Sequence, residues 1–122
     1  MATRVTDQVE ISDYLISYFN MVEHFGFEKI MNNFKDLIGF SGEYVHLFFK
    51  KSLEGVDWKA YKEIGDERVR LEYDLIGSGI YMYIDFVIFY NSLEQWLEEK
   101  YFSDVKILGL LKKVKEALGI EE

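Results

Sequence analysis

The period at which apolar residues recur changes twice along this 122-residue chain, and this change constrains the fold more than any other feature. Apolar side chains recur at three- and four-residue steps through 11–25 and again through 27–38, which predicts two helices, each ended by a glycine. From 68 to 85 apolar and polar residues alternate, as they do in strands, and the helical period returns from about Phe86. Helices on both sides of a run of strands indicate an α+β fold.

The strands of the central region are expected to form an antiparallel meander. Residues 44–50 are rich in β-forming types and predict a first strand, and residues 58–64 are interpreted as a short strand rather than a helical turn. Residues 69–75 and 80–84 are expected to pair as a hairpin through the tight loop Gly77-Ser78-Gly79. This region therefore predicts three or four antiparallel strands.

Two helices are expected after the meander. The first begins near Phe86, and the last is capped by Ser103-Asp104, carries its lysines late and stops at Gly119. The chain has no proline, no repeat and no linker, so residues 1–122 are expected to form a single domain. The complete prediction is two N-terminal helices, a three- to four-stranded antiparallel meander and two C-terminal helices.

The charge balance predicts the kind of partner. The chain has 22 acidic against 14 basic residues, a formal net charge of −8. Such a field repels nucleic acid and anionic membranes and attracts basic proteins, although an acidic surface can also serve solubility alone. The first residues do not resemble a signal peptide and no apolar run approaches ~18 residues, so a cytoplasmic location without membrane contact is expected.

The residue types disfavour catalysis. The chain has no cysteine, and neither His24 nor His46 belongs to a metal-ligand spacing. No serine lies in a Gly-x-Ser-x-Gly turn, and no phosphate-binding glycine pattern follows a strand. Glu72 and Asp74 share a strand face with arginines, which favours ionised pairs over an acid/base couple. We therefore expect no catalytic residue, no metal and no cofactor.

One face of the predicted sheet is a candidate binding surface. Alternation places Arg68, Arg70, Glu72 and Asp74 on the same side of their strand, and neighbouring strands offer tyrosines such as those at 81 and 83. Tyrosine and arginine are enriched among residues that dominate interfaces. Helices packed on this face would instead make the tyrosines amphipathic core, and both interpretations stay open at the level of the sequence.

The segment 54–74 is a second candidate, because it holds seven acidic against four basic residues with aromatic rings among them. An aromatic residue surrounded by acids is suited to docking onto a basic cleft, although the segment can equally be a solvated loop with a packing tryptophan. Taken with the sheet face, the predicted partner-binding residues are Asp57, Trp58, Tyr61, Glu63, Asp66, Glu67, Arg70, Glu72 and Asp74.

Residues 83–101 resemble the terminal strand-to-helix passage of small immunity proteins from bacterial contact-dependent growth inhibition systems, in particular those paired with ribonuclease toxins. In those proteins a strand ending in Ile-Asp leads into a helix with a Phe-Tyr pair and a leucine, as Ile84-Asp85, Phe89-Tyr90 and Leu93 do in this chain. The resemblance implies an inhibitor whose carboxylates occupy the cationic cleft of a nuclease toxin domain, without turnover.

Two other functions remain open from the sequence. A secretion chaperone is also small, acidic and α+β, and it would form a homodimer that holds an unfolded segment. A small carboxylate-dependent hydrolase or isomerase would require a deep pocket lined by a buried Asp or Glu.

Overall fold

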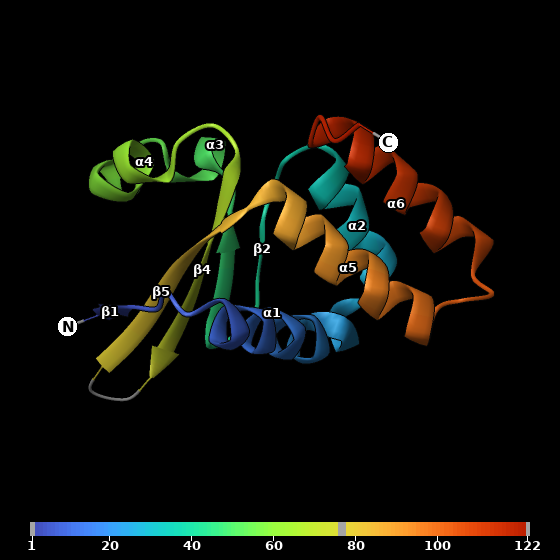
Figure 1. Ribbon diagram of the computed structural model, residues 1–122, viewed down its shortest axis with the longest axis horizontal. Helices are drawn as coiled ribbons and strands as arrows, with labels where there is room; N and C mark the ends of the chain where they lie inside the picture. Colours follow the sequence, from blue (N-terminus) through green and yellow to red (C-terminus); the bar gives the residue numbers. More distant parts are fainter. Residues whose placement is uncertain (1, 76–77, 122) are drawn as a thin grey trace.

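A computed structural model describes residues 2–75 and 78–121 and shows an α+β fold built on one five-stranded sheet (Figure 1). The strand order is β1-β5-β4-β3-β2. The strands are β1 (Ala2–Arg4), β2 (Phe40–Ser41), β3 (Val45–Phe48), β4 (Arg68–Leu75) and β5 (Ser78–Asp85). The helices are α1 (Gln8–Val22), α2 (Phe27–Lys35), α3 (Lys50–Leu53), α4 (Trp58–Ile64), α5 (Phe86–Lys100) and α6 (Val105–Ala117), with a 3-10 turn η1 (Glu23–Phe25).

The four longer helices form a layer against one face of the sheet, in which α6 packs on α2 and α5. Apolar residues at alternate positions of β3, β4 and β5 pack into one core with α1, α2, α5 and α6. The centre of this core is aromatic: the ring of Phe89 lies near those of Phe19, Phe34 and Phe49, at centroid distances of 6.2, 5.4 and 6.0 Å. In Figure 1 the short helices α3 and α4 lie at the upper left, apart from this layer.

The predicted hairpin is confirmed. β4 and β5 are antiparallel, with Val69 opposite Ile84 and Arg70 opposite Tyr83, so the apolar and polar positions of both strands fall on the expected faces. Of the loop predicted at 77–79, Gly77 lies outside the described residues, whereas Ser78 and Gly79 belong to β5.

The predicted three- to four-stranded antiparallel meander is wrong, because the sheet has five strands and one of its pairs is parallel. β1 runs parallel to β5, with Thr3 opposite Ile80, and β2 pairs antiparallel with β3. β1 is only three residues long, all of them exposed, and β2 is only two residues long, so neither carries the alternation by which a strand is recognised. Both become strands through pairing with partners already held in the sheet.

The predicted count of two N-terminal and two C-terminal helices is also wrong, because residues 2–75 and 78–121 form six helices, of which α3 and α4 lie between β3 and β4 in the sequence. Residues 58–64, interpreted as a strand, form α4. The carboxylate of Asp57 caps this helix by accepting a hydrogen bond from the backbone N–H of Ala60 at 3.0 Å. Ala60 and Ile64 lie four residues apart and are both buried, which is helical spacing in a stretch too short to establish a period.

Gly39 allows a close approach between the start of β2 and β3. A Cβ atom at this position would overlap the backbone carbonyl of Leu47, whereas a Cβ at Gly109 on α6 would meet no atom within 4 Å. We expect Gly39→Ala to lower the free energy of unfolding by about 1–3 kcal/mol. Gly109→Ala is expected to raise it by about 0.4–1 kcal/mol, because alanine restricts the unfolded chain in a helical position that has room for it.

Urea unfolding followed by circular dichroism measures both glycine variants. Equal stability of the two variants would contradict the close approach at Gly39.

Candidate functional site

The second face of the sheet carries the polar residues predicted from the alternation, and α3 and α4 cover part of it. His46 and Phe48 on β3 lie opposite Glu72 and Arg70 on β4. Beneath the two short helices, Leu53, Ala60, Ile64 and Tyr83 form a small second core. The sequence left open whether this face is buried or available to a partner. The structure shows both, because α3 and α4 cover the part around Tyr83 while the other end, at His46 and Asp74, stays at least partly exposed.

Arg70 lies inside this second face and is only 8% exposed. Its Nε donates to Glu72 at 2.6 Å, and its Nη1 donates to the hydroxyl of Tyr83 at 2.6 Å. Its guanidinium also lies 4.1 Å from the ring centroid of Tyr81. Burial alone would lower the pKa of Arg70, but the hydrogen bond and charge of Glu72 outweigh that effect and raise the pKa above its ordinary value. Arg70 therefore stays charged and links Glu72 on β4 to Tyr83 on β5.

Tyr83 joins α4 to the sheet. Burial raises the pKa of its hydroxyl, while the neighbouring guanidinium of Arg70 partly opposes that rise. The guanidinium of Arg68 lies 4.8 Å from the Tyr83 ring centroid and donates hydrogen bonds to the backbone carbonyls of Glu63 and Ile64 at the end of α4. These contacts hold α4 at a set position on the sheet, so side chains on its outer surface are presented in a fixed arrangement.

The uncovered end of the second face is small and polar. His46 Nε2 lies 2.7 Å from a carboxylate oxygen of Asp74, and the His46 ring stacks on Phe48. Asp74 is exposed but is occupied by this contact. The end of the face therefore offers few groups free for a partner.

The outer surface of α4 presents an aromatic stack. The rings of Trp58 and Tyr61 are nearly parallel, with centroids 5.3 Å apart, and Trp58 is 60% exposed. Lys62 lies over the Trp58 ring and Lys50 over the Tyr61 ring, each with its ammonium nitrogen 5.1 Å from the ring centroid. Tryptophan and tyrosine expose large, rigid contact areas and are enriched at interfaces. This stack is the most suitable anchor for a partner among the predicted site residues.

Two acidic residues of the turn after α4 extend this surface. Asp66 accepts a hydrogen bond from Lys50 Nζ at 2.9 Å and, with Tyr61 and Phe86, lines a hollow of about 460 Å³. Glu67 lines the neighbouring hollow, which also includes Phe86 in its wall. We call Trp58, Tyr61, Asp66 and Glu67 the α4 surface.

The structure separates the nine predicted partner-binding residues into two groups. Five of them make internal contacts. Asp57 caps α4, and Glu63 and Arg70 contact the hydroxyl of Tyr83. Glu72 accepts a hydrogen bond from Arg70, and Asp74 contacts His46. Of the α4 surface, Trp58, Asp66 and Glu67 are exposed, although Asp66 pairs with Lys50, and Tyr61 is half-buried against the second core. Sequence reasoning missed the contribution of Phe86, Asp85 and Glu121 to the adjacent hollow, because they reach it from the start of α5 and from the C-terminal segment.

The described residues hold no group of three or more His, Cys, Asp or Glu side chains arranged to bind a metal ion. Within the same residues, no helix has the length and apolar character needed to cross a membrane. Comparison of the chain with models of protein families, with curated proteins and with solved structures finds no match.

Proposed function

We propose that this protein is a cytoplasmic immunity protein that binds a basic toxin domain, of nuclease type, and blocks its active-site cleft. The observation that carries the proposal is the α4 surface, in which the exposed ring of Trp58 stacks on Tyr61 and the exposed carboxylates of Asp66 and Glu67 follow in the turn after α4. A nuclease binds phosphates through a cationic cleft, and an acidic inhibitor competes for the same charges. The net charge of −8 would speed the encounter with such a partner.

The distribution of charge supports binding rather than catalysis. Among residues 2–75 and 78–121, every Asp and Glu is at least partly exposed, and Arg70 is the single buried charged residue. An acid/base enzyme needs at least one carboxyl group in a desolvated environment to raise its pKa. The described carboxylates are in positions suited to interaction with a charged partner.

Rigidity also supports an inhibitory role. The α4 surface is held by the cap at Asp57 and by the contacts of Arg68 and Tyr83 beneath the helix. A surface that is ordered before binding loses less conformational entropy when the partner docks.

Growth rescue tests this proposal. The C-terminal domain encoded by the open reading frame immediately upstream is expressed under an inducible promoter, with or without this protein. We expect growth to stop in its absence and to continue when the two are co-expressed, with a one-to-one complex recovered by affinity purification. Loss of growth despite co-expression, with both proteins soluble, would rule out the immunity function.

A homodimeric secretion chaperone is the second candidate, and an exposed apolar patch favours it. Met21, Phe25 and Tyr44 are 39%, 42% and 62% exposed and line one hollow of about 220 Å³ between the end of α1 with η1 and the turn that joins β2 to β3. The chaperone function requires a stable dimer, whereas the immunity function requires a one-to-one complex with a folded domain. Light scattering of the purified protein measures its mass and separates these two expectations.

A further inference from the structure

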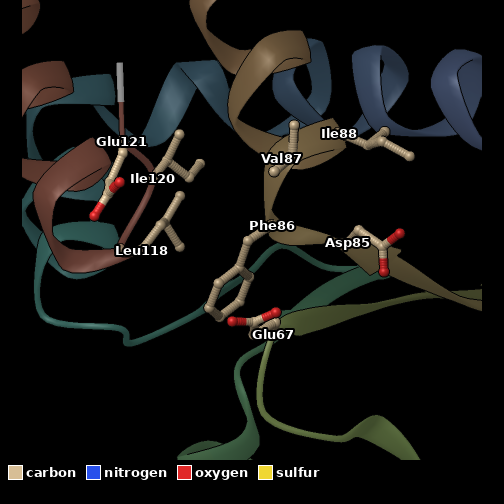
Figure 2. A pocket seen from close by; sticks show the side chains of 9 residues that line it. Glu67, Asp85, Phe86, Val87, Ile88, Leu118, Ile120 and Glu121 are labelled. Carbon is tan, nitrogen blue, oxygen red and sulfur yellow. The ribbon is translucent and has the colours of Figure 1, made fainter.

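A groove opens next to the α4 surface, where the start of α5 meets the segment that follows α6 (Figure 2). Its volume is about 840 Å³. Phe86 lies in the middle of it, with Leu118 and Ile120 on one side and Glu67 below (Figure 2). Further apolar side chains of α5 complete the lining, and one of them, Val87, is 54% exposed. The centre of the groove is therefore apolar and accessible.

The charges around this groove have a single sign. Glu67, Asp85 and Glu121 line it, and no lysine, arginine or histidine does so among the described residues. All three carboxylates belong to exposed residues. None of them forms an ion pair with a described residue, whereas Asp66, Glu23 and Glu28 elsewhere on the surface each contact a lysine. We call this feature the carboxylate groove.

We infer that the carboxylate groove binds a protein segment that carries both apolar side chains and lysine or arginine. The apolar side chains would pack on Phe86, Val87 and Ile120, where burial of their surface supplies free energy, about 25 cal/mol per Å² removed from water. The basic side chains would pair with the three carboxylates, which opposes occupation by acidic segments, by nucleic acid or by anionic lipid. The apolar lining and the acidic edge together specify this one occupant.

The position of the groove connects it to the proposed function. Phe86 lines both the carboxylate groove and the hollow that contains Tyr61 and Asp66, so the groove continues directly from the α4 surface. A basic partner anchored on Trp58 would place adjoining residues over the groove. The inference rests on the proposed function in one respect, because it takes the segment to belong to the toxin domain.

Peptide binding tests the groove without the toxin. The probes are fluorescein-labelled peptides with the repeats Lys-Leu-Leu-Lys, Lys-Ser-Ser-Lys and Glu-Leu-Leu-Glu, measured by fluorescence anisotropy at low and at physiological salt. We expect the Lys-Leu-Leu-Lys probe to bind at least about tenfold more tightly than either of the others. It alone has both apolar side chains for the lining and basic side chains for the carboxylates at the edge.

Two triple variants with equal changes in net charge locate the binding. Glu67→Gln, Asp85→Asn and Glu121→Gln together neutralise the groove, while Asp13→Asn, Glu98→Gln and Glu99→Gln neutralise exposed acids on α1 and α5. The groove variant is expected to weaken the Lys-Leu-Leu-Lys complex at least about tenfold and the control variant less than about twofold. Circular dichroism checks that both variants fold.

Three results would overturn the inference: equal weakening by both variants, equal affinity for the serine and leucine probes, or a dimer that the groove variant dissociates. The first two would reduce binding to attraction by net charge, and the third would make a second copy the occupant.

The growth assay gives a further test. Rescue by the groove variant at wild-type efficiency would also contradict the inference, provided that the wild type rescues. Failure of the wild type to rescue, with peptide binding intact, would contradict the proposed function and the assignment of the segment to a toxin domain, but not the binding of such a segment in the groove.

Discussion

Phe89→Ala is expected to lower the free energy of unfolding by about 3–5 kcal/mol, because it removes a buried ring and leaves a cavity. Phe89 is fully buried, and its ring lies between those of Phe19 on α1, Phe34 on α2 and Phe49 before α3. A domain of this length has a total stability of roughly 6–18 kcal/mol, so the loss is a large part of it. Urea unfolding followed by circular dichroism measures the change.

The control for this prediction lies two residues earlier on the same helix. Val87 is 54% exposed, so Val87→Ala is expected to change the free energy of unfolding by no more than about 0.5 kcal/mol. A loss below about 1 kcal/mol for Phe89→Ala would mean that the aromatic core described above does not set the stability of the fold.

Trp58→Ala is expected to weaken the complex with the toxin domain by about 30-fold, which corresponds to about 2 kcal/mol. Trp58 is 60% exposed and stacks on Tyr61, so its removal takes away the largest contact of the α4 surface and leaves the main core intact. The stability of the free protein should change little. Isothermal titration calorimetry with the purified toxin domain measures the affinity.

Phe102→Ala is the matched control for Trp58→Ala. Phe102 is 76% exposed and belongs to the connection between α5 and α6, and this connection lies at the opposite end of the molecule from α4 in Figure 1. Its removal is expected to leave the affinity unchanged. Equal affinities for wild type, Trp58→Ala and Phe102→Ala would exclude the α4 surface as the binding site, even if growth rescue succeeds.

The elements that were predicted correctly are those with a long and uniform period. α1, α2, α5 and α6 each bury a continuous apolar side, and β4 and β5 carry the alternation predicted over 69–75 and 80–84. In such segments the residue pattern alone decides between helix and strand, since the alternative structure would expose part of the apolar residues. The elements that were missed are short: β1, β2 and α3 have two to four residues each.

The candidate site was predicted as a set of residues but not as an arrangement. The sequence indicated Trp58, Tyr61 and the acids around them, yet it placed residues 58–64 on a strand, which would have sent Trp58 and Tyr61 to opposite faces. As a helix, the same residues carry both rings on one outer surface, where they stack. Arg70 was expected to take part in binding, but α4 covers it.

The amino-acid sequence by itself determined the α+β class, the central hairpin with its polar and apolar faces, and the acidic charge, because these depend on local period and composition. Only the tertiary structure decided which polar residues remain accessible. Packing of α4 over Arg70 and Tyr83, the parallel pairing of β1 with β5, and the meeting of Glu67, Asp85 and Glu121 around one groove all join residues distant in the chain. No local pattern records such contacts, since each depends on where the other elements pack.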